Sequence, residues 1–446
     1  MLEVSIPGNF TEERKYIIAT LLNGFLGIPH TTGIHGDPEK TIISFGNHRL
    51  IISDKFWSRC DAGKGYLRQE SIPSKVEYVK NSFTSEPDLP VIYGTGLIRQ
   101  TNHEITCDID IFASSFFLLS RWEEYVLPFR DEHSRFPGER SLAHTHGFLT
   151  RPVVNEYVEM LWKMLTALGY SYPRKTRRFH IKPTHDIDEI RFWNFKRFRS
   201  LPGNIAGDLL KRKSARLAFK RMTGFIAALL NPRRDPDNYF EQFMDLAEKT
   251  GTRADFNFIA GGTSPYDPGY PLNDRFCQLL FDTIIKRGHT IGIHPSYHSF
   301  RHRQRLEAEL ELLRALSHAP VESSRQHYLR FEVPATWQML EQTGIKTDST
   351  LYYPGFPGFR CGTCYEYPVF DVIRKKELDL TEQPLLLMDR CLLNKTTDEV
   401  SFTVKNLVEK TRKYEGTFVF LWHNRNFHWP GKNSIESLFK KELYGF

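Results

Sequence analysis

The 446-residue sequence contains no long apolar run and only six cysteines. Its longest apolar candidate, residues 225–230, is far shorter than the roughly 18 residues that a membrane-spanning helix needs. Residues 1–7 lack the basic and apolar regions of a secretory signal, so we expect a cytoplasmic protein. The scatter of the cysteines argues against a disulfide framework.

The first part of the chain lacks a nucleotide loop, a metal cluster and a nucleophile motif. Residues 1–172 are predicted to form a smaller mixed α/β domain whose role the sequence does not indicate. The expected helices are residues 11–26, 111–126 and 153–168, and the expected strands are 41–45, 50–53, 90–94 and 103–107. Residues 171–175 form a plausible linker to a second domain, 175–446.

Strand and helix patterns alternate in the second part of the chain, which indicates a parallel sheet. Polar motifs recur where strands end, which favours a (β/α) barrel with its site at the carboxyl ends of the strands. An open doubly wound sheet is the alternative, but no Gly-rich nucleotide loop follows the first strand. The expected strands are residues 179–186, 254–260, 290–294, 325–330, 346–350, 384–388 and 417–423.

A strongly basic insertion interrupts this pattern. Residues 191–234 contain twelve Lys or Arg residues and a single acid, Asp208, whereas the whole chain has a formal net charge of only +7. Aromatic and leucine residues are interleaved with the basic ones. Such a segment can lie on an anionic membrane surface, bind an acidic glycan, or be a solvated basic face. Nothing in it resembles a motif that reads nucleic acid, so we expect no nucleic-acid partner.

Two groups of polar residues follow predicted strands. Asp186 and Asp188 end the first strand, and a carboxylate pair in that position can hold a divalent cation and leave one oxygen free as a base. His294 follows another strand, and Pro295 suits the first position of a helix, which would set His294 and His298 one turn apart. One carboxylate and two imidazoles form a three-ligand set for Zn²⁺ or a similar ion.

These motifs resemble the polysaccharide deacetylase family, carbohydrate esterase family four. Residues 184–188 (Thr-His-Asp-Ile-Asp) and 294–298 (His-Pro-Ser-Tyr-His) match its first two motifs, with Pro295 where Ser or Thr is usual. The resemblance covers residues 175–446, and the part before it resembles an uncharacterised domain that precedes such barrels in some bacteria. The resemblance implies a deformed (β/α) barrel, for which we expect about seven strands. It also implies an enzyme that removes N- or O-acetyl groups from glycans.

The resemblance also implies a role for each site residue. Asp188, His294 and His298 would bind the metal, and Asp186 would be the catalytic base. Residues 324–330 match the third motif, with His327 in place of a proline. There Arg325 would hold Asp186 ionised, and the backbone N–H of Tyr328 would help to bind the oxyanion; Arg330 is a rival for the arginine role.

His423, which follows the last predicted strand, would be the general acid. The carboxylate that orients it is left open between Asp348 and Asp389, because the fourth motif is damaged. Together with the resemblance, these residues predict a hydrolase that uses a divalent metal, most readily Zn²⁺, on an N-acetylated glycan. The basic insertion and the missing secretory signal lead us to expect that this glycan can be lipid-linked and that the protein acts at the inner face of the membrane. The alternatives are a non-catalytic glycan-binding protein that keeps the barrel and a membrane-surface scaffold.

Overall fold

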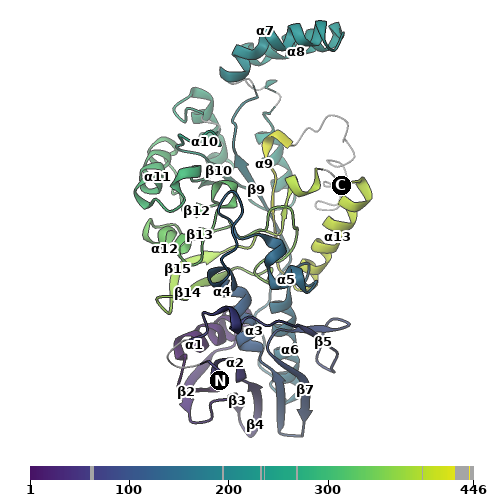
Figure 1. Ribbon diagram of the computed structural model, residues 1–446, viewed down its shortest axis with the longest axis vertical. Helices are drawn as coiled ribbons and strands as arrows, with labels where there is room; N and C mark the ends of the chain where they lie inside the picture. The colour runs from purple at the N-terminus through teal and green to yellow at the C-terminus, as the bar shows by residue number, and fades with distance from the viewer. Residues whose placement is uncertain are drawn as a thin grey trace. The chain divides into compact units, whose positions relative to one another are not determined.

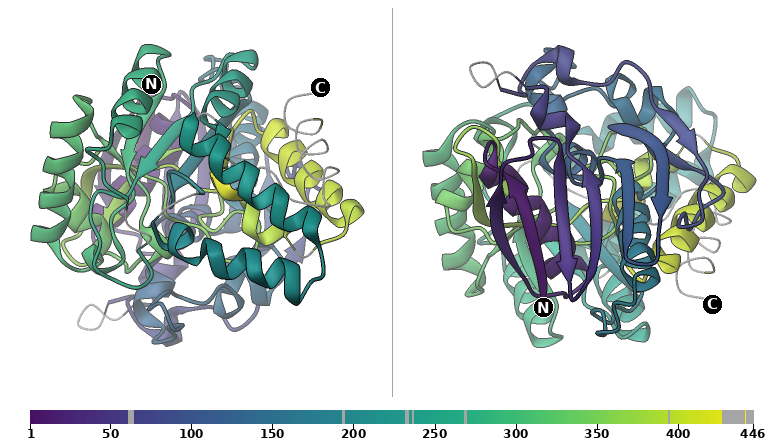
Figure 2. Two further views of the ribbon diagram at one scale, coloured as in Figure 1. Left: turned by 90° about the horizontal axis from the view of Figure 1, so that it is seen from above. Right: turned by 90° about the horizontal axis from the view of Figure 1, so that it is seen from below.

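The computed structural model of the chain (Figures 1 and 2) divides into two compact units, and both are discontinuous in sequence. Unit 1 comprises residues 1–180, 328–387 and 406–419, and unit 2 comprises residues 181–327, 388–405 and 420–446. The structure describes residues 1–60, 65–192, 195–231, 234–235, 237–267, 270–393, 395–426 and 441. The predicted domain boundary at residues 172–175 lies close to the end of the first segment of unit 1, and it stays a prediction.

Unit 1 contains a six-stranded mixed sheet in the order β2-β1-β3-β4-β8-β7, part of which is seen from below in Figure 2. β1 pairs in parallel with β2, and β4 with β8, whereas the β1–β3, β3–β4 and β7–β8 pairs are antiparallel. The strands are β1 (Leu2–Pro7), β2 (His30–His35), β3 (Lys40–Phe45), β4 (His48–Ser53), β7 (Gly94–Gln100) and β8 (Glu104–Ile109). A separate ribbon pairs β5 (Glu77–Val79) with β6 (Leu89–Val91).

The helices of unit 1 follow the apolar patterns of the sequence. They are α1 (Thr11–Ala19), α2 (Lys55–Ser58), α3 (Ile111–Ser120), α4 (Trp122–Val126), α5 (Leu142–Thr145), α6 (Val153–Ala167) and α12 (Ala335–Gln342). α3 is buried along its whole length and packs against α1 and α6, which is why its sequence is apolar on every side. The predicted helix 111–126 is broken at Arg121, whose left-handed backbone (φ 54°) separates α3 from α4.

Later segments of the chain also belong to unit 1. β15 (Lys376–Glu382) pairs in parallel with β13 (Thr347–Asp348) and antiparallel with β14 (Tyr367–Asp371). A buried charge network connects these later segments with α4: Glu124 accepts hydrogen bonds from Arg121 and Tyr353 at 3.0 Å each and from Arg360 at 2.5 Å. Removing one partner from such a network leaves an uncompensated buried charge, so we expect it to hold these segments together.

Unit 2 is built on parallel strands in the order β9-β10-β11-β12. They are β9 (His180–Ile187), β10 (Asp255–Phe258), β11 (Thr290–Ile293) and β12 (Ser323–Ser324), and α9 (Phe240–Lys249), α10 (Arg275–Lys286) and α11 (Arg303–Ser317) come between them in sequence. α10 and α11 both pack on β11, and β10 and β11 are short and largely buried, as expected for parallel strands that helices cover. The helices α7 (Phe195–Leu210) and α8 (Ala215–Leu230) are inserted between β9 and β10.

Several described elements cross the division between the units in sequence, and they include β16 (Leu387–Met388), α13 (Thr397–Lys413) and β17 (Thr417–Leu421). β9 does so as well, since it begins at His180, the last residue of the first segment of unit 1. The end of β17 belongs to unit 2, where the backbone N–H of Trp422 donates to the carbonyl of Thr184 at 3.0 Å. The residue that follows β17 therefore lies beside the end of β9.

The predicted mixed α/β class with parallel strands is confirmed. The strand pairings of the described residues do not show a closed barrel, so the barrel stays a prediction. The predicted strand at 325–330 is wrong: β12 ends at Ser324, and a 3-10 turn occupies His327–Leu329. Tyr328 and Leu329 have left-handed backbones (φ 60° and 54°), which a strand cannot contain.

Candidate metal centre

The carboxyl ends of parallel strands bring the polar residues of unit 2 together. β9 ends at Ile187, directly before Asp188, and β11 ends at Ile293, directly before His294. Arg325 directly follows β12, and His327 comes two residues later, at the start of a 3-10 turn. Since β9, β10, β11 and β12 are parallel neighbours, the residues that follow them meet at one edge of the sheet.

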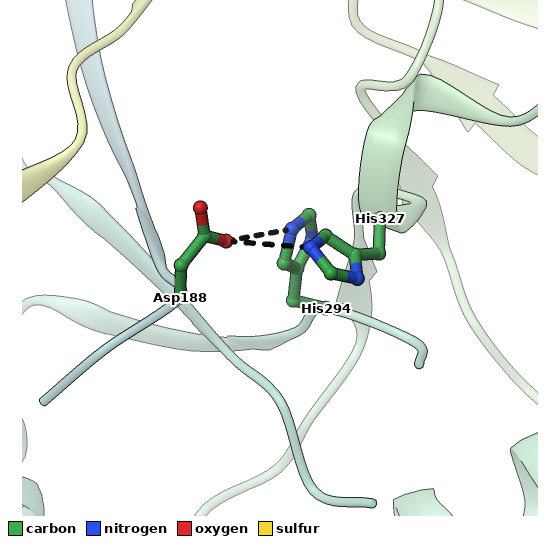
Figure 3. Close-up of side chains that lie close together, drawn as sticks. All are labelled: Asp188, His294 and His327. Carbon is green, nitrogen blue, oxygen red and sulfur yellow. Dashed lines mark ion pairs between the residues drawn. The ribbon is translucent and has the colours of Figure 1, made fainter. Parts of the chain in front are cut away.

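Asp188, His294 and His327 form a buried group that can hold a metal ion (Figure 3). One side-chain ligand atom from each lies within 4.8 Å of the others. Asp188 Oδ1 is 3.6 Å from His294 Nε2 and 3.7 Å from His327 Nε2. These distances are too long for hydrogen bonds. They are close to the spacing of about 3.4 Å between two ligands that each bind one tetrahedral zinc at about 2.0–2.1 Å.

The Nδ1 atom of each imidazole, on the side away from the metal group, has a hydrogen-bond partner. His294 Nδ1 lies 2.5 Å from the carbonyl oxygen of Arg325, which can only accept, so Nδ1 carries the proton. His327 Nδ1 lies 3.0 Å from Asp267 Oδ1, and Asp267 is fixed by hydrogen bonds from the backbone N–H groups of Tyr297 and Ser264. Carboxylate and carbonyl partners of this kind fix the tautomer and leave Nε2 free to bind a metal.

The electrostatics of Asp188 also suit a cation. Within the described part of the chain, its Oδ1 is buried and has no hydrogen-bond partner. Burial raises the pKa of this carboxyl, but the imidazoles of His294, His423 and His327 lower it by a larger amount. The net pKa therefore lies well below its ordinary value. An ionised, buried and unpartnered carboxylate oxygen beside two oriented imidazoles therefore fits a divalent ion, and the N/O set matches Zn²⁺.

Asp186, the other carboxylate of β9, is held in one orientation. Its Oδ1 accepts hydrogen bonds from Asn257 Nδ2 at 2.9 Å and from Arg325 Nη1 at 3.2 Å, and Arg325 is itself fully buried. Its Oδ2 lies 3.8 Å from His294 Nε2 and so faces the metal group. Burial raises the pKa of Asp186, but His294 and Arg325 lower it, with a net decrease. Asp186 is therefore ionised and presents Oδ2 to the site.

His423 is paired with Asp389, one of the two carboxylates that the sequence left open. His423 Nδ1 lies 2.7 Å from Asp389 Oδ1, while Asp389 Oδ2 accepts from the backbone N–H of His423 and from Asn426 Nδ2, each at 2.9 Å. His423 Nε2 lies 3.9 Å from Asp188 Oδ2. Burial lowers the pKa of His423, but Asp389 raises it, and the net pKa is above its ordinary value. The other carboxylate, Asp348, belongs to unit 1 and accepts a hydrogen bond from Thr350.

His298, which the sequence predicted as a metal ligand, is not a member of this group. Ser296 has an extended backbone (ψ 161°), and Tyr297–Ser299 form a 3-10 turn, so no α-helix sets His298 one turn beyond His294. The side chain of His298 is exposed, and its ring packs against that of Tyr297. The structure brings His327, and not His298, close to Asp188 and His294.

Buried polar partners hold the loop after His294 in this extended form. Glu309 accepts hydrogen bonds from the Ser296 hydroxyl and backbone N–H and from the Ser299 hydroxyl, at 2.5, 2.9 and 2.6 Å. Three donors on one buried carboxylate fix the backbone that separates His294 from His298, which explains why a helical spacing argument fails here.

Sequence reasoning missed three residues of the site: Asn257, Asp267 and His327. His327 carried a signal, since it stands where the third motif of the resembled family has a proline. Asn257 and Asp267 carried none, because neither belongs to a motif or ends a predicted strand.

The oxyanion role predicted for the Tyr328 backbone N–H stays a prediction. Tyr328 directly follows His327, its carbonyl accepts a hydrogen bond from Arg135 Nη1 at 2.9 Å, and its ring packs on His133. The rival arginine of this motif, Arg330, donates to the carbonyl of His133 at 2.9 Å, whereas Arg325 contacts Asp186.

Residues 2–170 match the model of a family of unknown function (DUF7033). No curated protein matches the chain. Among solved structures, a "putative polysaccharide deacetylase" from Mycobacterium smegmatis aligns with a TM-score of 0.38 at 13% sequence identity, over 62% of this chain and 85% of that one.

Proposed function

We propose that the chain is a metal-dependent hydrolase that removes acetyl groups, chiefly N-acetyl groups, from a glycan or glycoconjugate. The observation that carries the proposal is one buried site in unit 2 with three elements: the Asp188–His294–His327 group, an ionised Asp186 and a carboxylate-paired His423. A metal group, a base and an acid are the set that metal-assisted hydrolysis of an amide requires.

The metal group would hold a divalent ion, for which Zn²⁺ is the best match to one carboxylate and two imidazoles. When bound, such an ion polarises a carbonyl oxygen and acidifies a water molecule. Asp188, His294 and His327 leave at least one coordination position for that chemistry, as catalytic zinc sites do.

Asp186 is the proposed general base. Its Oδ1 is occupied by Asn257 and Arg325, so Oδ2, which faces His294, is the atom that would take the proton of the attacking water. The buried guanidinium of Arg325 keeps this carboxyl ionised before the reaction and holds its plane fixed.

His423 is the proposed general acid, and it would donate its proton from Nε2 to the departing group. Asp389 holds Nδ1 and raises the pKa of the imidazole, which keeps it protonated closer to neutral pH. An amine leaves a tetrahedral intermediate poorly unless it is protonated, whereas an alkoxide needs this assistance less. The paired His423 therefore supports N-deacetylation over O-deacetylation.

The finer parts of the proposal come from the motifs rather than from the site. A deformed (β/α) barrel, a glycan as substrate and an oxyanion contact from Tyr328 are what residues 184–188, 294–298 and 324–330 imply by resemblance. A cytoplasmic location is part of the proposal too, but the resemblance does not imply it. A lipid-linked glycan is the substrate class that the basic insertion supports. Among the described residues, no helix combines the length and the apolar character needed to cross a membrane.

Acetate release from purified protein tests the proposal. The protein would be stripped with a chelator, reloaded with Zn²⁺, and assayed on a panel of N-acetylated sugars that includes lipid-linked ones. Acetate release should require the metal, and Asp186→Asn should abolish it while metal content stays near one ion per chain, because Asp186 is assigned as base. Asp188→Asn should lose the metal. Hydrolysis that survives both chelation and Asp186→Asn would refute the proposed function.

A further inference from the structure

The helical hairpin of α7 and α8 has no part in the proposed chemistry. The two helices lie side by side in the views from the side and from above (Figures 1 and 2). They follow β9 and precede α9 in sequence, so they form an insertion within unit 2.

One face of α8 is used to pack against α7. Ala218 and Ala228 are buried, and the ring of Phe225 lies 5.6 Å from that of Phe198 on α7. Residues 218, 221, 225 and 228 recur at helical spacing and define this face. The end of the hairpin is closed by Asp208, whose carboxylate binds Arg212 Nη1 at 2.5 Å and Arg221 Nε at 2.8 Å.

A second apolar face of α8 is exposed. Phe219, Met222, Ile226 and Leu229 are 64%, 44%, 46% and 70% exposed, and their spacing of three and four residues places them on one stripe of the helix. This stripe is turned about 100° from the face that packs on α7, by the helical period. We call the four residues the apolar stripe. Exposed apolar side chains gathered in this way mark an interaction surface rather than scattered surface residues.

The apolar stripe is bordered by positive charge. Lys211, Lys213, Arg216 and Lys220 are exposed and form no ion pair with any described residue. The one acid of residues 191–234, Asp208, is already neutralised by two arginines, so no carboxylate of the segment opposes these four cations. Arg233 lies outside the described residues, and so do the side chains of Lys196 and Arg197.

We propose that the hairpin docks on the surface of an anionic lipid bilayer, with the apolar stripe in the interfacial region and the four cations on the headgroups. Charge complementarity selects an anionic partner, and the apolar stripe selects a bilayer among anionic partners. A soluble acidic polymer would engage the cations and leave Phe219, Ile226 and Leu229 in water, so it explains only half of the surface.

Docking would keep the metal group close to the membrane. Six residues lie between Asp188 and Phe195, the first residue of α7, and the seven Cα–Cα steps of an extended chain span at most about 25 Å. Asp188 therefore lies within about 25 Å of the start of the hairpin in any arrangement of the connection. The docking proposal does not depend on the proposed function. If both hold, the substrate is a glycan attached to a lipid of the same membrane.

Co-sedimentation of the full chain with vesicles tests the proposal. Neutral phosphatidylcholine vesicles would be compared with vesicles containing about one third phosphatidylglycerol, at low and high salt. Binding should require the anionic lipid and weaken with salt, because salt screens exposed charges. Replacing Lys211, Lys213, Arg216 and Lys220 by Glu should weaken it by at least about 100-fold.

The apolar stripe is tested separately by Phe219→Gln, Ile226→Gln and Leu229→Gln, which should weaken binding by at least about tenfold with the charge unchanged. The matched control replaces three exposed apolar residues elsewhere in unit 2, Leu279, Leu312 and Phe402 (55%, 44% and 73% exposed), by Gln and should bind like the parent. Circular dichroism would verify that every variant is folded. These readouts do not depend on hydrolysis, so a failure of docking and a failure of the proposed function are distinguishable.

Several outcomes would overturn the proposal. Equal binding to neutral vesicles would refute the role of charge, and unchanged binding of the stripe variant would refute the role of the apolar face. Absence of vesicle binding combined with retention on an acidic polysaccharide would replace the bilayer by a soluble polyanion. Absence of vesicle binding combined with dimerisation that the stripe variant abolishes would assign the stripe to a second copy of this chain.

Discussion

The comparison of His327→Ala with His298→Ala is the sharpest test of the metal centre, because sequence and structure assign the third ligand differently. His327 Nε2 lies 3.7 Å from Asp188 Oδ1 within a buried group, whereas the His298 side chain is exposed. We expect His327→Ala to lose metal binding and His298→Ala to keep it. The two substitutions remove the same atoms, so each serves as the matched control for the other.

The expected magnitude follows from the number of ligands. Loss of the hydrogen-bond partner of a metal ligand typically weakens metal binding by about 10–100-fold. Loss of one of three direct ligands should therefore weaken metal binding by at least about 100-fold. With free Zn²⁺ at about 1,000 times the parent Kd, binding stabilises the fold by about 4.1 kcal/mol. After a 100-fold loss the same Zn²⁺ is only about ten times Kd, and the stabilisation falls to about 1.4 kcal/mol.

Two measurements check this difference of about 2.7 kcal/mol. Metal content after gel filtration should be near one ion per chain for the parent and His298→Ala, and near zero for His327→Ala. Unfolding in urea with and without Zn²⁺ should show the full metal-dependent stabilisation of about 4.1 kcal/mol in the same two proteins and only about 1.4 kcal/mol in His327→Ala. If His298→Ala loses the metal and His327→Ala retains it, the geometric assignment of the ligand set is refuted.

Three further predictions concern groups that support the site or the fold. Asp267→Ala should weaken metal binding by about 10–100-fold, measured by competition with a chelator, and Asp267→Asn should recover part of the loss because its amide oxygen can still accept from His327. Asp389→Asn should retain the metal and lower kcat on an amide by about 10²–10⁴-fold, with a smaller loss on an activated ester; equal losses would contradict the acid role of His423. In unit 1, burial raises the pKa of Glu124, but Arg360 lowers it by a larger amount. The net pKa is about 2, compared with an ordinary 4.5. The stabilisation from Glu124 is therefore complete above pH 4.5 and lost as pH falls toward 2. In urea unfolding at pH 7, Glu124→Gln should be less stable than the parent by about 3–5 kcal/mol. The variant should also lack the acid-dependent loss of stability that Glu124 causes in the parent.

The sequence by itself identified the strands that carry the chemistry and several of the residues at their ends. Apolar runs of strand length precede Asp188, His294 and His423, and the ends of parallel strands must meet at one edge of a sheet. Three of the predicted segments correspond to β9, β11 and β17, with boundaries within two residues of the prediction. The basic character of residues 191–234 and the apolar residues interleaved with it were also evident from the sequence, since charge and composition are local properties. The helices α7 and α8 were not predicted.

Only the tertiary structure decided how the site is completed. The sequence spacing of His294 and His298 fits a helical turn, but Glu309 holds the intervening backbone extended, and a residue after β12 then supplies the second imidazole. The choice of Asp389 over Asp348 beside His423 is of the same kind. Each choice depends on which distant segments share a sheet edge, and neither periodicity nor motif spacing within one segment contains that information.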